Sequence, residues 1–256
     1  MKVVILAGGL GTRISEETET KPKPMVLIDD KPIIWHIMNT FAKQGNFDFL
    51  IALGYKGEVI KDWLKSNRAE SQERLLAGLS ENDFISRKGD SIISSLDTGL
   101  STQTGGRIAK CMETLPGERV IVTYGDGLAN VPIAELLEFH INHGRLATVT
   151  AVRPPARFGY LNIEGSLVTH FGEKNQSDTG WINGGFFVLE PEVISFIHSS
   201  DEPFEIGALP RLVLEKQLMA FYHDDFWQPM DTLRERNELA ELAKDRTPPW
   251  LRVPTA

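Results

Sequence analysis

The chain has 256 residues, of which 41% are hydrophobic, and it carries a formal net charge of −8. This composition predicts one globular domain over residues 1–256 and excludes general nucleic-acid binding, which needs a basic surface. The N-terminus has too few apolar residues for a signal peptide or a membrane span, and a single cysteine, Cys111, allows no internal disulfide, so we expect a cytoplasmic protein that binds neither membrane nor nucleic acid.

Apolar runs and helical patterns alternate along the first part of the chain. Continuous apolar runs, which are typical of strands covered on both faces, lie at residues 3–7, 48–53, 119–124 and 146–152. Helical periodicity lies at residues 32–45, 57–67, 105–115 and 131–144. This order predicts an α/β fold of the Rossmann-like type, with a mixed, mainly parallel sheet and helices on both faces.

The second part of the chain changes character. Shorter alternating runs at 159–165, 167–173 and 184–190 predict the strands of a smaller subregion over residues 153–225. The last segment, 226–256, is expected to hold a helix capped by Asp231, followed by a tail. Residues 66–103 have mixed charge and weak periodicity, and we expect a loop or an oligomer contact there.

The glycine-rich segment LAGGLGTR, residues 6–13, follows the first predicted strand. It lacks the third small residue of a dinucleotide loop, because Ile14 stands there, and no Gly-Lys-Ser/Thr of a P-loop follows. Glycines nevertheless let backbone N–H groups approach phosphate oxygens. Arg13 adds a forked donor, and Lys23 adds a charge between Pro22 and Pro24. The segment therefore predicts a polyphosphate site.

Two aspartates are candidates for a Mg²⁺ site. Asp126 follows the predicted strand 119–124, at the edge where open α/β sheets bind ligands, and Asp231 lies beside the final helix. Each alone is also explained as a turn or cap residue, but two carboxylates with a polyphosphate suit Mg²⁺. His140 and His143 have the spacing of a metal pair, but no third ligand lies nearby, and an exposed helix end is the simpler interpretation.

Six stretches together resemble the sugar-1-phosphate nucleotidyltransferase family. They are LAGGLGTR, KPKPM (21–25), TGGR (104–107), YGDG (124–127), INGGFFV (182–188) and FWQPMDTLRE (226–235). The chain is similar in particular to the cytidylyltransferases that act on glucose 1-phosphate, over nearly its whole length but weakly over 66–95. The resemblance implies a homo-oligomeric, Mg²⁺-dependent enzyme that converts CTP and a sugar 1-phosphate to a CDP-sugar and pyrophosphate. Residues 1–152 would bind the nucleotide and 153–225 the sugar.

The resemblance also implies roles for single residues. It makes Arg13, Lys23, Asp126 and Lys174 catalytic, and it makes Asp126 and Asp231 the metal ligands. The residues expected to bind the nucleotide are Leu6, Ala7, Gly8, Gly9, Gly11, Thr12, Arg13, Lys23, Thr104, Gly106 and Arg107. The residues expected to bind the sugar phosphate are Tyr124, Glu173, Lys174, Asn183 and Gly184.

Three alternatives stay open. Asn175 stands where the family usually has proline, and FEIGALPRL (204–212) lacks the expected Glu-Pro-Leu, so the acceptor could be another hexose, a heptose or a non-sugar phosphate, and the nucleotide another NTP. A nucleotide-binding module without catalysis would have no need for all the charged residues named above. A NAD-dependent dehydrogenase is disfavoured by Ile14 and by the lack of an acid after the second strand.

Overall fold

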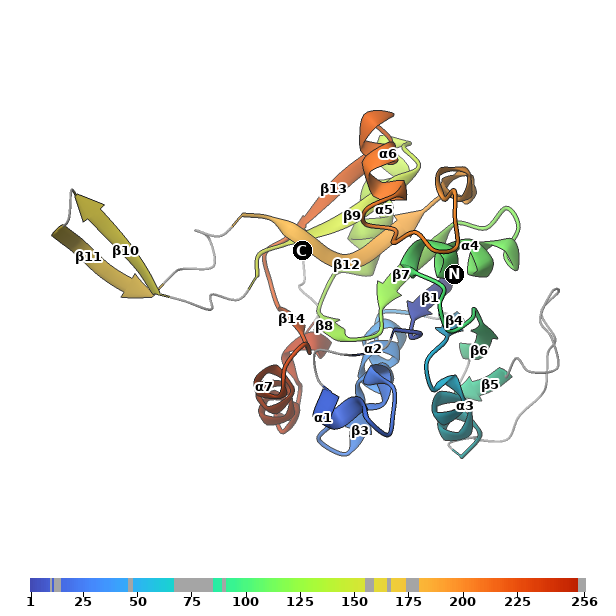
Figure 1. Ribbon diagram of the computed structural model, residues 1–256, viewed down its shortest axis with the longest axis horizontal. Coiled ribbons are helices and arrows are strands. Elements are labelled where there is room, and N and C mark those ends of the chain that lie inside the picture. The colour runs from blue at the N-terminus through green and yellow to red at the C-terminus, as the bar shows by residue number, and fades with distance from the viewer. Residues whose placement is uncertain are drawn as a thin grey trace.

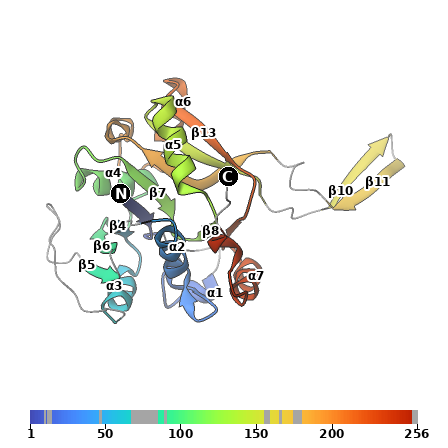
Figure 2. The same cartoon turned by 180° about the vertical axis from the view of Figure 1, so that it is seen from behind.

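The structure is a computed structural model, and it describes residues 1–9, 11, 15–45, 48–66, 85–88, 91–154, 159–164, 167–173 and 180–252. Its central feature is one large sheet that runs through the body of the molecule (Figures 1 and 2). Within the described residues the sheet has eight strands, in the order β13 (Leu218–His223), β9 (Ala147–Val152), β12 (Ile182–Leu189), β7 (Val120–Tyr124), β1 (Lys2–Leu6), β4 (Asp48–Leu53), β6 (Ser91–Asp97) and β5 (Ile85–Lys88).

The sheet is mixed and mainly parallel, as predicted. β1 pairs in parallel with β4 and β7, β4 with β6, and β9 with β13. β12 runs antiparallel to both of its neighbours, β7 and β9, and β5 runs antiparallel to β6. The four apolar runs correspond to β1, β4, β7 and β9 with boundaries that differ by at most one residue.

Helices cover both faces of the sheet (Figure 1). They are α1 (Ser15–Thr18), α2 (Ile33–Ala42), α3 (Gly57–Ser66), α4 (Thr104–Glu113), α5 (Ile133–His143), α6 (Ala208–Leu214) and α7 (Leu233–Ala243), with short 3-10 helices η2 (Lys23–Met25), η4 (Pro191–Phe196) and η5 (Pro249–Leu251). Val3 and Ile5 pack in one core with α2, α3, α5 and α7, whereas Val4 and Leu6 pack in a second core with α4, η4 and α6. No described helix combines the length and the apolarity needed to cross a bilayer.

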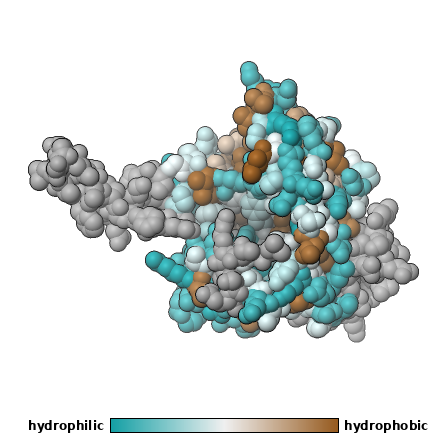
Figure 3. All heavy atoms as spheres, viewed as in Figure 1, coloured by the Kyte–Doolittle hydropathy of each residue, from teal (hydrophilic) through white to brown (hydrophobic). Residues whose placement is uncertain are grey.

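Three small two-stranded sheets are also found among the described residues. They are β10 (Gly159–Glu164) with β11 (Leu167–Glu173), β14 (Trp227–Pro229) with β8 (Gly127–Ala129), and β2 (Leu27–Ile28) with β3 (Lys31–Pro32). The β10–β11 pair stands away from the main sheet in Figures 1 and 2. On the face seen in Figure 3, the described apolar residues lie as separate spots among polar ones, which is ordinary for a protein surface.

The expectation of a loop or an oligomer contact over residues 66–103 was wrong for residues 85–88 and 91–97, because β5 and β6 are strands of the main sheet. Residues 67–84 lie outside the described residues, and the oligomer contact stays a prediction. β6 pairs with β4 from Ile93, opposite Phe49, to Asp97, opposite Leu53. Two of its residues, Ser94 and Ser95, are buried, and the Ser94 hydroxyl donates to the Phe49 carbonyl at 3.0 Å. Because these buried positions of β6 carry polar side chains, the sequence shows no continuous apolar run there, and the strand was not predicted.

The prediction of a smaller subregion over residues 153–225 was also wrong in part. β12, which contains the run 184–190, is the antiparallel member of the main sheet, and β13 is its edge strand. Every residue of β12 from Gly184 to Leu189 is buried, as expected for a strand covered on both faces. Of the predicted strands in 153–225, only β10 and β11 pair outside the main sheet.

The expectation of an exposed helix end for the histidine pair was wrong for His140, although α5 does end at the partly exposed His143. His140 is buried, and its Nδ1 and Nε2 lie 2.7 Å from Thr148 Oγ1 and 3.2 Å from Glu190 Oε1. His143 Nε2 lies 2.7 Å from the same Thr148 hydroxyl, and Glu190 also accepts from Arg119. Burial lowers the pKa of both histidines. The pair is part of a hydrogen-bonded network between α5 and the sheet.

Candidate active site

The candidate site lies where β1 and β7 end side by side. Leu6, the last residue of β1, is opposite Tyr124, the last residue of β7, and the Gly125 N–H donates to the Leu6 carbonyl at 3.0 Å. The glycine loop and Asp126 therefore leave the sheet at the same place. β12 begins beside this edge with Ile182 and Asn183. The carboxyl ends of parallel strands are where open α/β sheets bind ligands.

The glycine loop is open to a ligand at Gly9 and closely packed at Gly8. A Cβ on Gly8 would lie 2.2 Å from Arg107 Nη1, so a larger residue does not fit, whereas a Cβ on Gly9 would meet no atom within 4 Å. Gly11 has φ of +64°, and its carbonyl accepts from Thr18 Oγ1 at 3.0 Å. A backbone exposed in this way can offer its N–H groups to an anion. Thr12 and Arg13 lie outside the described residues.

Arg107 supports the glycine loop from within the protein. Its side chain is buried, and its guanidinium donates to the carbonyl oxygens of Leu53, Gly8, Gly99 and Leu100 and to Thr98 Oγ1, at 2.8, 2.9, 2.9, 3.4 and 2.6 Å. Burial lowers its pKa. These contacts join the loop after β1 to the loops after β4 and β6. A direct contact between Arg107 and the nucleotide stays a prediction.

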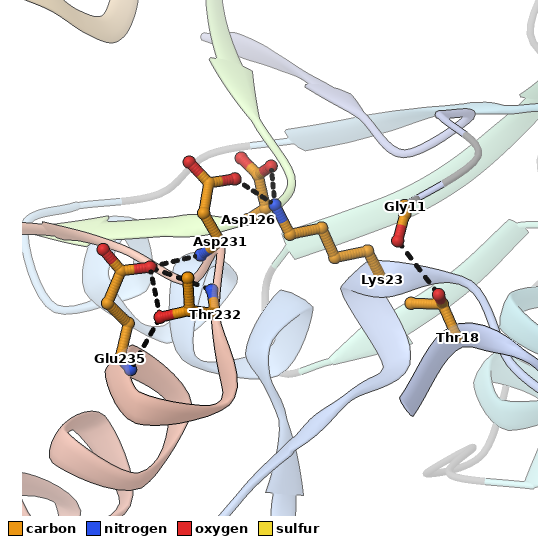
Figure 4. A network of polar contacts seen from close by, with 7 residues as sticks. All are labelled: Gly11, Thr18, Lys23, Asp126, Asp231, Thr232 and Glu235. Atoms are coloured by element: carbon orange, nitrogen blue, oxygen red, sulfur yellow. Dashed lines mark hydrogen bonds and ion pairs between the residues drawn. The ribbon is translucent and has the colours of Figure 1, made fainter. Parts of the chain in front are cut away.

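Lys23, Asp126 and Asp231 meet at one point (Figure 4). Lys23 Nζ lies 2.7 Å from Asp126 Oδ2 and 2.7 Å from Asp231 Oδ1. The lysine side chain is 10% exposed and the two aspartates are 36% and 25% exposed, so the carboxylates face solvent more than the ammonium does. Burial alone would lower the pKa of Lys23, but the charges and hydrogen bonds of the carboxylates outweigh it, and the pKa is raised.

Backbone pairing brings the two aspartates together although they are far apart in the chain. β14 pairs with β8 so that Pro229 lies opposite Gly127, and the Met230 N–H donates to the Asp126 carbonyl at 2.8 Å. Asp231 is the next residue, and its carboxylate therefore reaches the same place as that of Asp126 (Figure 4). Lys23 is delivered by η2, which is buried along its length.

The prediction that Asp231 caps the final helix was wrong. Thr232 is the cap: its Oγ1 accepts from the Glu235 N–H at 3.2 Å, and Glu235 Oε2 accepts from the Thr232 N–H at 2.9 Å. This reciprocal arrangement is a capping box, and Glu235 Oε2 also accepts from the Asp231 N–H at 2.8 Å. The box holds the backbone of Asp231 while its carboxylate binds Lys23 (Figure 4). The spacing Thr232 to Glu235 was visible in the sequence.

The two carboxylates fit a divalent cation. Because both contact one nitrogen atom at 2.7 Å, their oxygens converge on a single point. Mg²⁺ is typically held by one or two carboxylates together with substrate phosphates. No group of three or more acidic, histidine or cysteine side chains that could hold a metal occurs among the described residues. A cation here would therefore rely on phosphate oxygens as well as on Asp126 and Asp231.

Of the residues expected to bind the sugar, Asn183 and Gly184 lie at the start of β12, and Tyr124 ends the neighbouring strand β7. Asn183 Nδ2 donates to the Tyr124 hydroxyl at 3.3 Å, and Asn183 Oδ1 accepts from the Gly185 N–H at 2.8 Å. β12 has an irregular register with β9 between Asn183 and Phe187, as a β-bulge would give. The carbonyl of the buried Gly184 accepts from Trp227 Nε1 at 2.8 Å. Glu173 ends β11, its side chain is not described, and Lys174 lies outside the described residues.

The TGGR segment packs against residues 200–205, which include the start of FEIGALPRL, the stretch whose departure from the family pattern left the acceptor open. Thr104 Oγ1 accepts from the Phe204 N–H at 2.8 Å and donates to Glu205 Oε2 at 2.7 Å. Added Cβ atoms on Gly105 and Gly106 would lie 2.6 and 2.5 Å from carbonyl oxygens of residues 202 and 200, so both positions need glycine for this close approach. Nucleotide contacts of Thr104 and Gly106 stay predictions. Glu205 lies in FEIGALPRL, which differs from the family pattern.

Comparisons with known proteins bear on the family and the fold of the chain. A family model described as "Nucleotidyl transferase" matches residues 2–235. The glucose-1-phosphate cytidylyltransferase of Salmonella typhi is 45% identical over 254 residues, which cover 98% of each chain, and a probable glucose-1-phosphate cytidylyltransferase of Bacillus subtilis is 37% identical over 98% of this chain and 99% of the relative. Among solved structures, HddC from Yersinia pseudotuberculosis in complex with GMP-PN superposes with a TM-score of 0.70 at 24% identity, covering 95% of this chain and 99% of that one.

Proposed function

The chain belongs to the nucleotidyl transferase family, and on that premise we propose that it joins CTP and α-D-glucose 1-phosphate to give CDP-glucose and pyrophosphate. The observation that carries the proposal is the 45% identity to the Salmonella typhi cytidylyltransferase, which extends over 98% of both chains. The site adds support, because a glycine loop, a buried lysine and two carboxylates meet at one edge of the sheet.

The reaction is an in-line displacement. An oxygen of the sugar phosphate attacks the α-phosphorus of CTP, the bond from that phosphorus to the bridging oxygen breaks, and pyrophosphate leaves with the electron pair. Such transfers depend on the positioning of the reactants and on neutralisation of charge more than on covalent help from the protein. The open backbone at Gly9 suits the phosphates of the nucleotide.

The cations of the site then have separate roles in the proposal. Arg13 and Lys23 neutralise the phosphates that become the leaving group, and Lys174 steers the sugar phosphate. Asp126 and Asp231 hold a Mg²⁺ ion, which when bound would neutralise phosphate charge and orient the α-phosphate. In the structure Lys23 Nζ is hydrogen-bonded to Asp126 and Asp231. To contact a phosphate of the nucleotide, the lysine must therefore give up at least one of these two bonds.

Two further expectations belong to the proposal. A homo-oligomer is implied by the resemblance, and light scattering coupled to size-exclusion chromatography measures it directly. A cytoplasmic location agrees with a lone cysteine, Cys111, that is buried as a free thiol.

The test is a substrate panel. The purified chain is incubated with each of four NTPs and with a set of phosphates that includes glucose, galactose, mannose, heptose and non-sugar phosphates, and pyrophosphate release is followed with Mg²⁺ and with EDTA. We expect the highest kcat/KM for CTP with glucose 1-phosphate and no turnover with EDTA. Faster turnover with another combination of NTP and acceptor would show that the proposed substrates are wrong. CTP binding without turnover on any acceptor would favour a regulatory module instead.

A further inference from the structure

Glu205 is a carboxylate beside the sugar end of the site. It lies between η4 and α6, it is half-buried, and its two oxygens accept hydrogen bonds from different elements. Oε2 accepts from Thr104 Oγ1 at 2.7 Å, and Oε1 accepts from the Tyr124 hydroxyl. Within the described part of the chain, no lysine or arginine forms an ion pair with it. Among the residues that the structure describes, its side-chain hydrogen-bond partners are the two hydroxyl groups.

The loop that carries Glu205 is held firmly in place. The Gln103 N–H donates to the Ser200 carbonyl at 2.9 Å, and the Phe204 N–H donates to Thr104 Oγ1 at 2.8 Å. The ring of Phe204 is buried and packs edge-to-face on Phe187 of β12, with centroids 5.5 Å apart. The loop is thus fixed to the start of α4 and to the sheet. This makes the position of the Glu205 carboxylate well defined.

The hydrogen bonds of Glu205 determine which groups remain for a ligand. An ionised carboxylate only accepts hydrogen bonds, and a phenol has a single proton, so the Tyr124 proton is directed to Glu205. The Tyr124 oxygen must then accept the bond from Asn183 Nδ2 at 3.3 Å, while Asn183 Oδ1 accepts from the Gly185 N–H. One N–H of Asn183 and one lone pair of Tyr124 remain. Burial and the nearby charge of Glu205 raise the pKa of Tyr124, so the phenol keeps its proton.

We propose that Glu205 is a positioning residue for the sugar phosphate, because it fixes the direction of the hydrogen bonds in the Tyr124–Asn183 pair. The pair presents one donor and one acceptor side by side, which suits a sugar hydroxyl that accepts from Asn183 and donates to Tyr124. The inference rests on the proposed function, since it concerns the acceptor of that reaction. It also links the TGGR segment, through Thr104, to the sugar end of the site.

The test is the variant Glu205→Gln, measured in the full-length protein. Glutamine has nearly the same shape, but its amide can donate to the Tyr124 oxygen and so reverse the direction of the network. We expect the KM for glucose 1-phosphate to rise about tenfold, which corresponds to one hydrogen bond of ordinary strength, and the KM for CTP to stay within about twofold. The matched control is Glu202→Gln. Glu202 lies in the same loop but pairs with Arg211, so this variant should change neither KM.

A double-variant cycle separates this role from a purely structural one. If Glu205 acts through the phenol, adding Glu205→Gln to Tyr124→Phe should not raise the KM for glucose 1-phosphate further. Equal changes in both KM values, or a lower melting temperature with unchanged KM values, would overturn the proposal. If Glu205→Gln does not fold, Glu205→Asp, which keeps the charge but shortens the side chain, must give the same selective change.

The proposed function fails independently of this inference. Its failure shows in the unmodified chain, as absence of turnover with CTP and glucose 1-phosphate in the substrate panel. In that case the KM comparison is made with the acceptor that the panel identifies. A selective rise in the KM of that acceptor would support the role of Glu205, and an unselective one would contradict it.

Discussion

Two buried cations adjoin the glycine loop after β1, and their surroundings differ in kind. Lys23 contacts two carboxylates that are partly open to solvent, whereas the described hydrogen bonds of Arg107 go to four carbonyl groups and one hydroxyl. The carboxylates outweigh the effect of burial and raise the pKa of Lys23, whereas burial lowers that of Arg107. Ion-pair partners that solvent reaches can be exchanged for phosphates and a metal ion. Buried carbonyl groups have no such replacement, and the arginine that binds them stabilises the loop.

The largest effect expected from this difference is on catalysis. Lys23→Ala should reduce kcat about 100- to 1000-fold, which is the usual effect of removing one group that stabilises charge in a transition state. Its melting temperature should change little, because a cation or water can reach the two carboxylates. The measurement is pyrophosphate release under saturating substrates, paired with a thermal melt.

The matched control for Lys23 is Lys21→Ala. Lys21 is two residues away, and its ammonium lies 3.3 Å from Glu17 on a half-exposed surface, so its loss should leave kcat unchanged. Unchanged turnover in Lys23→Ala would contradict a catalytic role for Lys23, and with it the proposed difference between Lys23 and Arg107.

The second effect is on stability. Arg107→Met removes the donors for the carbonyls of Gly8 and Leu53, and a buried carbonyl without a partner costs about 1–3 kcal/mol. We expect the unfolding free energy to fall by at least about 2 kcal/mol, and the melting temperature by about 4–8 °C. The exposed Arg234→Met is the control and should melt as the unmodified chain does. If Arg107→Met melts normally but loses nucleotide affinity, Arg107 is a ligand-binding residue and not a support.

A smaller effect concerns the backbone that carries Asp231. Thr232→Ala removes the cap of α7 and should lower the unfolding free energy by about 1 kcal/mol. Because the same capping box fixes the Asp231 N–H, the apparent Mg²⁺ affinity in the assay should also weaken. Thr232→Ser keeps the hydroxyl and should restore both quantities. A stability loss with unchanged Mg²⁺ dependence would show that the cap acts on the helix alone.

A further effect depends on pH and is expected from the histidine network of α5, where burial disfavours the protonated side chains. Burial lowers the pKa of His140 and His143, so the unfolded chain binds protons more readily than the folded one near pH 6.5. Stability is therefore complete above that pH and is lost as the pH falls toward the lowered folded values, by at most about 1.4 kcal/mol per pH unit for each histidine. Urea unfolding between pH 8 and pH 5.5 measures this slope, which His140→Gln should reduce. If the unfolding free energy of His140→Gln changes with pH as steeply as that of the unmodified chain, the pH dependence comes from other groups.

The sequence predicted the sheet where strands were apolar and failed where they were not. The runs that became β1 and β4 are buried on both faces and were located correctly. β6 was missed because Ser94 and Ser95 satisfy their hydroxyls inside the core. β12 was found as a strand but placed outside the main sheet, because sequence periodicity does not tell which strands become neighbours.

The same limit applied to the site. The sequence named Lys23, Asp126 and Asp231 as site residues. Their mutual contact, however, depends on the pairing of β8 with β14, which no local sequence pattern predicts. The resemblance implied that Arg107 binds the nucleotide, whereas its described contacts are carbonyl groups and the Thr98 hydroxyl, which only the folded chain brings together. Glu205 lies in FEIGALPRL, a stretch that the sequence did connect with the choice of acceptor, but its hydrogen bonds to Thr104 and Tyr124 depend on the folded chain.

The pairing of β8 with β14 also has a consequence for how the protein is made. Lys23 and Asp231 are 208 positions apart in the chain. On a ribosome, the glycine loop, Lys23 and Asp126 emerge long before the segment that supplies Asp231, so the second carboxylate joins the cluster only when that late segment docks. Contacts between such distant residues form slowly, because a long loop must close first. The ability to bind substrate should therefore be among the last properties acquired in refolding, after most of the sheet has formed.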